Sequence, residues 1–188
     1  MAIGDKKSVV MGFDKAAPNG VATLDANGNV PREQLGNVVN LNLLHNWYFV
    51  NPVNQRGKAM YDIANYTIDR WKKSNNGETV YVEDSCVKIS AKENGYLIQT
   101  VENHTLFADK TVTLSALIKS TTGRAEVRID DGKNTYIGHT YSAGLVTVTA
   151  TLATDLTKIL IELSAQNGIS AEFIAAKLEL GSTQTLAR

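Results

Sequence analysis

Apolar and polar residues alternate with a period of two along most of the second half of this chain. In residues 111–118 the even-numbered positions are apolar and most odd-numbered positions are polar. The same alternation runs through residues 125–130, 146–152 and 159–163. Successive side chains of a strand point to opposite faces, so this pattern predicts strands with one buried face. With no convincing period of 3.6 residues, the chain is expected to be an all-β protein, an antiparallel β-sandwich.

Tight-turn dipeptides separate these segments. Asparagine or aspartate followed by glycine readily takes the positive φ angles of two-residue hairpin turns. Such pairs occur at Asn76-Gly77, Asn94-Gly95, Asp131-Gly132 and Asn167-Gly168. The sequence therefore predicts hairpins at these positions, although alternation alone does not order the strands.

Charge and hydropathy exclude several kinds of partner. The 188 residues contain 19 basic and 19 acidic side chains, so no broad positive field attracts a phosphate backbone and nucleic acid is not expected as a partner. The apolar runs, such as residues 159–161 and 173–176, are far shorter than the ~20 residues that cross a bilayer, so no membrane partner is expected. Charged residues begin at Asp5, which predicts synthesis and assembly in a cytoplasm. Cys86 is the single cysteine and is expected to be a buried thiol.

Residues 1–40 differ in composition from residues 41–188. The first region is rich in glycine, asparagine, aspartate and alanine and has too few apolar side chains to bury a core alone. We therefore expect a short, extended attachment or oligomerisation region that needs partner chains, followed by one sandwich domain. The attachment residues expected within it are Val21, Leu24, Val30, Pro31 and Leu35.

Two phrases follow this boundary. Residues 42–57 read Asn-Leu-Leu-His-Asn-Trp-Tyr-Phe-Val-Asn-Pro-Val-Asn-Gln-Arg-Gly, and residues 66–71 read Tyr-Thr-Ile-Asp-Arg-Trp. They resemble the opening of a β-sandwich domain found in bacteriophage fibre and receptor-binding proteins. Residues 20–35, Gly-Val-Ala-Thr-Leu-Asp-Ala-Asn-Gly-Asn-Val-Pro-Arg-Glu-Gln-Leu, are similar to a phrase near the N-terminal or shaft part of phage fibres. The motif residues are Trp47, Phe49, Asn54, Gln55, Arg56, Asp69, Arg70 and Trp71.

The resemblance implies a fold and a setting. Residues 114–120 and 176–181 are similar to strands of carbohydrate-binding-module-like jelly rolls, which implies a jelly-roll topology. Fibre proteins further imply a homotrimer, contacts with other virion proteins (capsid, tail or baseplate), and a place in the virion. Both a tail position and a head-fibre or capsid-decoration position are compatible with the phrases.

Patterns for catalysis and metal binding are absent from the sequence. His45, His104 and His139 lie far apart, and residues 25–36 depart from a calcium loop because the twelfth position is Gly36. The nucleophile pattern Gly-x-Ser-x-Gly and the phosphate-binding loop do not occur. We expect no catalytic residue, no metal and no cofactor, while spacing does not address a structural calcium elsewhere in the sandwich. The carboxylates Asp62, Asp69, Glu83 and Asp84 are interpreted as surface charge rather than a glycosidase pair.

Aromatic residues are the better candidates for a binding site. An exposed ring can stack on the C–H face of a sugar while neighbouring polar groups bond its hydroxyls. Trp47, Phe49 and Trp71 are expected to be buried, and an arginine of the motif is expected to tie to Asp69. The expected glycan-contacting patch consists of Asn134, Tyr136, His139 and Tyr141.

Three functions follow from these observations. The first is a fibre-type structural protein of a phage or prophage virion, which displays a carbohydrate-binding-like sandwich for host-surface polysaccharide. The second is a stand-alone glycan-binding module. The third, least favoured, is a glycan depolymerase.

Overall fold

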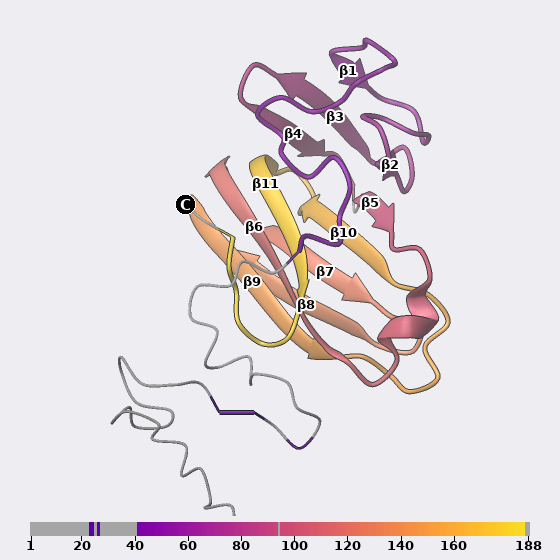
Figure 1. Ribbon diagram of the computed structural model, residues 1–188. Helices are drawn as coiled ribbons and strands as arrows, with labels where there is room; N and C mark the ends of the chain where they lie inside the picture. The colour runs from indigo at the N-terminus through magenta and orange to yellow at the C-terminus, as the bar shows by residue number, and fades with distance from the viewer. Residues whose placement is uncertain (1–22, 25, 27–40, 94, 187–188) are drawn as a thin grey trace, which may run out of the picture. The chain divides into compact units, whose positions relative to one another are not determined.

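The computed structural model describes residues 23, 24, 26, 41–93 and 95–186 (Figure 1). The chain divides into two compact units, Met1–Val39 and Asn40–Arg188. The architecture below is that of the second unit. Of the expected attachment residues, Leu24 is described and is exposed, whereas Val21, Val30, Pro31 and Leu35 lie outside the described residues.

The second unit is built from strands and one short 3₁₀ helix. The helix, η2, spans His104–Phe107. Within the described residues no helix is long and apolar enough to cross a membrane. The strands are β1 (Met60–Tyr61), β2 (Lys72–Lys73), β3 (Glu78–Glu83), β4 (Cys86–Ala91), β5 (Leu97–Thr100), β6 (Thr111–Thr121), β7 (Ala125–Asp130), β8 (Thr135–Thr140), β9 (Gly144–Thr151), β10 (Leu160–Ala165) and β11 (Ser170–Leu180).

These strands form two antiparallel sheets. The large sheet has six strands in the order β1-β3-β4-β11-β6-β9, and the small sheet has five in the order β2-β5-β10-β7-β8. Figure 1 shows β6, β9 and β11 beside one another, with β7, β8 and β10 in the other layer. Between β1 and β11 the chain changes sheet at every connection except β3–β4 and β7–β8. This alternating path between two antiparallel sheets is that of a jelly-roll-like sandwich, and the predicted fold class is confirmed.

The inner faces of the sheets form the core. Val112, Leu114, Ala116 and Ile118 of β6 are at most 2 % exposed, as the alternation predicts. Ile161 and Leu163 of β10 face them from the small sheet and are fully buried. Because inward positions are apolar, the outward positions of the same strands remain for polar contacts.

The turn predictions met different outcomes. Asp131-Gly132 joins β7 to β8 within one sheet, and Gly132 has φ of 85°, so this hairpin is confirmed. Asn76-Gly77 and Asn167-Gly168 instead connect strands of different sheets, and so does the connection between β4 and β5 that contains Asn94-Gly95, of which Asn94 lies outside the described residues. The hairpins predicted at these three pairs are wrong. Gly168 does have positive φ, 77°. Gly77 is not among the glycines with positive φ, so the dipeptide alone fixes neither the local backbone nor the strand pairing. The pairing follows from burial of the inner face of each sheet.

Candidate ligand-binding surface

Residues 42–49 extend the large sheet along β11. Strand β4 pairs with β11 over residues 170–173. Beyond that point the 42–49 segment takes over, where Leu43 N donates to Leu178 O at 2.8 Å and Phe49 N donates to Ile174 O at 2.8 Å. The first half of the motif is therefore an irregular edge of the sandwich.

The large aromatic residues of the motif anchor this edge. Phe49 and Trp71 are fully buried and meet edge to face, with ring centroids 5.5 Å apart. The Trp71 indole N–H lies 3.1 Å from both the His45 and the Asn46 carbonyl oxygens, so burial leaves its polar atom satisfied. The predicted burial of Phe49 and Trp71 is confirmed, and neither ring is available to a ligand.

Trp47 departs from the prediction of burial. It is 37 % exposed and lies edge to face with Tyr48, which is 50 % exposed. Asn46, immediately before it, has φ of 48°, so the chain turns at this point and the Trp47 ring does not enter the core with Phe49. The expectation that all three motif aromatics are buried is therefore wrong for Trp47.

Polar residues of the motif hold two loops together. The Asn46 amide donates to Val53 O at 2.8 Å and to Asp69 O at 2.9 Å. Asp69 accepts hydrogen bonds from Gln55 N at 2.9 Å and from Arg56 Nη1 at 3.2 Å. The structure thus contains the tie between an arginine and Asp69 that the sequence suggested. It fixes loop 53–57 against loop 66–71.

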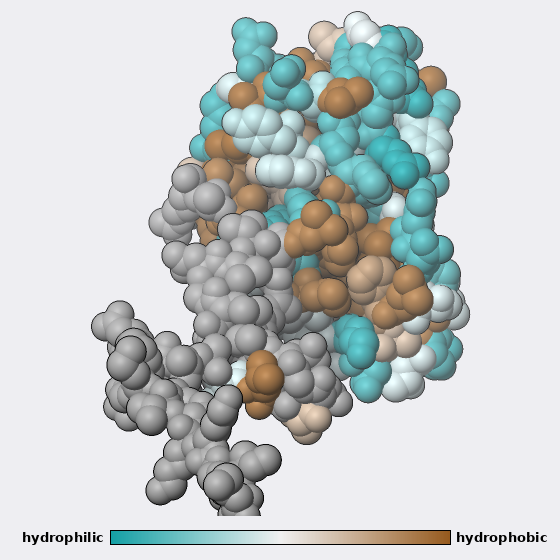
Figure 2. All heavy atoms as spheres, viewed as in Figure 1, coloured by the Kyte–Doolittle hydropathy of each residue, from teal (hydrophilic) through white to brown (hydrophobic). Residues whose placement is uncertain are grey.

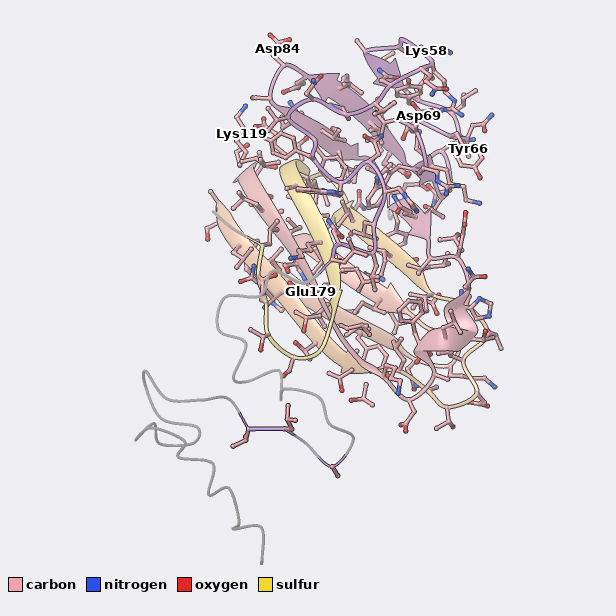
Figure 3. All side chains as sticks on the ribbon, in the orientation of Figure 1. Lys58, Tyr66, Asp69, Asp84, Lys119 and Glu179 are labelled. Carbon is pink, nitrogen blue, oxygen red and sulfur yellow. The ribbon has the colours of Figure 1, made fainter. Side chains whose placement is uncertain are left out.

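The two loops border a polar cleft of about 690 Å³ beside β2 and β5. Figure 3 shows Tyr66 and Asp69 as neighbours at this end of the unit, and Figure 2 shows hydrophilic side chains gathered at the same end. The cleft is lined by Gln55, Arg56, Tyr66, Asp69, Arg70, Lys72, Ile98, Gln99, Thr100 and Glu102. Asn54 of the motif does not line it, because its side-chain amide donates to Lys58 O at 2.8 Å and its oxygen accepts from the Tyr61 hydroxyl.

The outer face of the small sheet carries a second group of polar and aromatic side chains, continuous with the cleft. Arg128 lies between the core residues Val127 and Ile129 of β7, so it points outward. Its guanidinium sits 4.6 Å from the centre of the Tyr96 ring, which places Tyr96 on the same face. In register, Arg128 neighbours Glu162 of β10, which in turn neighbours Ile98 of the cleft.

Ion pairs stabilise the charges on this face. Glu126 is 2 % exposed and lies 2.8 Å from Arg124 Nε and 2.8 Å from Arg128 Nε. Burial raises the pKa of Glu162, while the nearby Arg128 charge counteracts the shift. The face therefore offers an ordered set of hydrogen-bonding groups beside rings.

The four residues of the expected glycan patch occupy different positions. His139 and Tyr141 are exposed and meet edge to face, with centroids 5.7 Å apart. His139 lies opposite the outward-facing Glu126 in the β7–β8 register, so it belongs to the outer face. Tyr136 is half-buried against the core and its hydroxyl donates to Thr151 O at 2.9 Å. Asn134 is exposed in the β7–β8 turn.

The outer face of the large sheet is partly covered by the segment after β11. Lys177 and Glu179 of β11 are buried, and the Lys177 ammonium lies 3.4 Å from Glu179. Thr185 crosses over them: its N–H and hydroxyl donate to Glu179 at 2.7 and 2.6 Å, and its hydroxyl accepts from Lys177. Figure 3 labels Glu179 near the end of β11, where it is the next-to-last residue of the strand. A ligand therefore has freer access to the small sheet.

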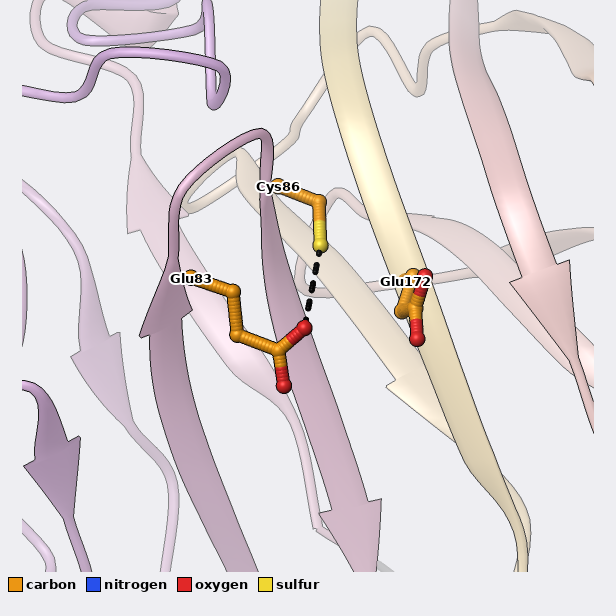
Figure 4. Close-up of side chains that lie close together, drawn as sticks. All are labelled: Glu83, Cys86 and Glu172. Atoms are coloured by element: carbon orange, nitrogen blue, oxygen red, sulfur yellow. Dashed lines mark hydrogen bonds between the residues drawn. The ribbon is translucent and has the colours of Figure 1, made fainter.

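Three residues near the β3–β4 turn place atoms of the kind that bind metal ions close together. Glu83, Cys86 and Glu172 present one oxygen or sulfur each within 4.8 Å of one another (Figure 4). The Lys119 ammonium lies 3.7 Å from Glu172 and already neutralises that carboxylate. Burial, with the neighbouring Glu172 charge, raises the pKa of the Cys86 thiol to about 11, so the thiolate that binds metal is scarce. The predicted burial of Cys86 is confirmed, and the group resembles a packed ion pair more than a metal site.

Sequence reasoning missed several residues of this surface. Tyr66 stands in the phrase of residues 66–71 but was not assigned a role in binding. Lys72 and Tyr96 did not stand out because single aromatic or basic residues beside short strands form no pattern. Arg128 was visible only as the polar half of the β7 alternation. Outward positions 126, 128 and 130 are all charged, but this is also the ordinary pattern of a solvated sheet face and does not by itself indicate a binding site.

Comparison with known proteins adds a weak structural likeness. No protein-family model matches the chain, and no curated protein sequence matches it. The CBM22-1–GH10 part of the Clostridium thermocellum xylanase 10B, solved with xylohexaose, is similar at 9 % identity and TM-score 0.48 over 69 % of this chain and 29 % of that chain. A family 29 carbohydrate-binding module is similar at 9 % identity and TM-score 0.42 over 65 % of this chain and 86 % of that one. The assignment of fold rests on the strand pairing described above.

Proposed function

We propose that residues 40–188 bind a polysaccharide on the outer face of the small sheet. The observation that carries this proposal is the placement of rings beside ordered charged groups on one open face: the exposed His139 of β8 with the exposed Tyr141 just after it, and the half-buried Tyr96 with Arg128 nearer the middle. Sugar rings present both an apolar C–H face and hydroxyl groups, and this combination of side chains is complementary to both.

The dimensions of the face fit a chain ligand. Five strands spaced about 4.8 Å apart extend over about 19 Å from β2 to β8. An extended oligosaccharide that crosses the strands would contact the His139–Tyr141 pair at one side and the cleft at the other. The function is binding, and no residue is assigned a catalytic step.

The test is binding to an array of bacterial cell-wall and capsular polysaccharides, followed by titration calorimetry on the best ligand. Tyr141→Ala is expected to weaken binding about tenfold, since it removes one stacking ring. Tyr81→Ala is the matched control, because Tyr81 lies on the outer face of the large sheet, beside Lys88. Absence of binding to every polysaccharide at millimolar sugar, or equal losses in both variants, would contradict the proposal.

For the setting we propose a fibre-type protein of a phage or prophage virion, assembled in the host cytoplasm, with residues 1–40 attaching the sandwich to the particle. The support is the pair of phrases at residues 20–35 and 42–71. The stand-alone glycan-binding module remains the alternative, and it predicts the same sugar binding. The oligomeric state of the full chain distinguishes the fibre-type protein from the stand-alone module.

A further inference from the structure

We propose that the cleft beside β2 and β5 binds an acidic group of the polysaccharide, a sugar-borne oxyanion such as the carboxylate of a uronate. This inference rests on the proposed function, because the cleft would act as one end of the same binding face. It names the class of ligand, an anionic rather than a neutral polysaccharide, and the residues that select it.

The wall of the cleft carries more cationic than anionic side chains. It contains three cationic side chains, Arg56, Arg70 and Lys72, and two carboxylates, Asp69 and Glu102. Guanidinium groups present several N–H donors in one plane and suit carboxylate and phosphate oxygens. A wall with an excess of cations in a chain of net charge zero is a local arrangement rather than a consequence of overall composition.

The two carboxylates of the cleft leave cationic groups available to a ligand. Asp69 is committed to Arg56 and to Gln55 N, with Oδ1 and Oδ2 each accepting one hydrogen bond. Glu102 pairs with Arg70 at 3.0 Å, but both side chains are more than half exposed, so this pair contributes little and can open. Lys72 is exposed and makes no ion pair within the described part of the chain. Arg70 and Lys72 are therefore the groups that would meet an incoming oxyanion.

The backbone around Arg70 is held in a fixed geometry. Arg70 has φ of 71°, a left-handed conformation unusual for a residue with a side chain. Trp71 N donates to Ile68 O at 3.1 Å and Asp69 N donates to Val53 O at 3.0 Å, so the backbone on both sides of Arg70 is held. Tyr66 is 50 % exposed, and the Arg56 guanidinium lies 5.4 Å from the centre of its ring. The loop thus presents Arg70 from an ordered backbone, beside a ring that a sugar can contact.

The cleft is continuous with the outer face of the small sheet. Lys72 of β2 neighbours Ile98 of β5, and Ile98 neighbours Glu162 of β10. Ile98 and Thr100 line the cleft and also face outward on the small sheet. A sugar chain that stacks on Tyr141 can therefore reach Arg70 and Lys72 without leaving the sheet.

Titration calorimetry with three probes of equal length tests the inference: an oligogalacturonate, a neutral oligoglucan and a glycerol phosphate oligomer. The acidic probes are expected to bind at least tenfold more tightly than the neutral one at low salt, with the difference shrinking in 0.5 M NaCl. Binding of the galacturonate alone identifies a carboxylate as the ligand group, and binding of the phosphate oligomer alone identifies a phosphodiester. Equal affinity for all three probes would overturn the inference.

Variants locate the effect in the cleft. Arg70→Gln and Lys72→Gln are each expected to weaken acidic-probe binding about tenfold. Lys88→Gln carries the same charge change on the outer face of the large sheet, and is expected to leave binding unchanged. Glu102→Gln is expected to tighten acidic-probe binding several-fold, because it removes the carboxylate that competes for Arg70, and unfolding cannot mimic a gain.

The outcomes separate this inference from the proposed function. If neutral and acidic probes bind equally and Tyr141→Ala weakens both, the binding face is retained and acidic selectivity is wrong. If the acidic probes bind but Lys88→Gln matters as much as Lys72→Gln, the effect is general electrostatics and the cleft is not the site. If no probe and no arrayed polysaccharide binds, both proposals fall.

Discussion

At the scale of single residues, Asp131 shows how one buried carboxylate organises a turn. It is fully buried at the start of the β7–β8 connection. Its Oδ1 accepts from Lys133 N at 2.8 Å and Asn134 N at 2.7 Å, and its Oδ2 accepts from Ala153 N at 3.0 Å. Burial alone would raise the pKa of Asp131, but these backbone N–H groups together lower it below its ordinary value of 3.8. The carboxylate therefore joins the hairpin to the loop after β9.

Asp131→Asn is expected to lower the free energy of unfolding at pH 7 by about 1 to 3 kcal/mol. Both carboxylate oxygens accept from backbone N–H groups, so the NH₂ of the asparagine would have to face one of these donors. A lowered folded pKa means that the stability from ionised Asp131 is complete above pH about 4 and is lost as pH falls through the folded pKa. Urea unfolding from pH 7 to 2.5 should thus show wild type and variant converging in acid. Asp84→Asn, in the exposed β3–β4 turn of Figure 3, is the control and should follow wild type. A pH-independent gap would contradict the assignment.

At the scale of elements, the sequence predicts the strands better than it predicts their connections. The alternating segments become β6, β7, β9 and β10, because a strand must bury one face whatever its partner. The 42–49 edge has no alternation, since its hydrogen bonds to β11 come from an irregular segment with a turn at Asn46. The cleft depends on contacts between residues 53–57 and 66–71 and on strand β5, and spacing along the chain does not reveal such contacts. His139 and Tyr141 could be predicted as neighbours because they lie two residues apart at the end of a strand, with Tyr141 just after the last residue of β8.

The segment after β11 yields a prediction at the same scale. Thr185→Val keeps the shape of the side chain but removes the hydroxyl that bonds Glu179 at 2.6 Å and accepts from Lys177. The free energy of unfolding is expected to fall by about 1.5 to 3 kcal/mol, the usual range for a hydrogen bond to a charged group. Thr183→Val, at an exposed neighbour, should change it by less than about 0.5 kcal/mol. Equal midpoints for the two variants in thermal unfolding would mean that the segment does not stabilise β11.

At the scale of the whole molecule, the two units carry different parts of the proposed function. The buried apolar residues of the core lie between Leu44 and Leu178, all within Asn40–Arg188. This unit therefore has its own core and should fold when residues 1–39 are removed. The sugar-binding proposal concerns this unit, whereas attachment and trimerisation are assigned to the N-terminal region on the resemblance of residues 20–35 alone.

Light scattering on the full chain and on a chain that begins at Asn40 tests this division. The fibre proposal predicts a trimer for the full chain and a monomer after truncation. One copy of residues 1–40 has too few apolar side chains to form a core, so these residues are expected to bury them against the same region of other copies. Circular dichroism with a β-type spectrum and unchanged polysaccharide affinity would serve as the folding control for the shorter chain. If both chains are monomers, the trimer prediction is wrong and the stand-alone binding module is favoured. If both chains are trimers, the contacts between subunits lie in the sandwich domains, and residues 1–40 are not what holds the trimer together.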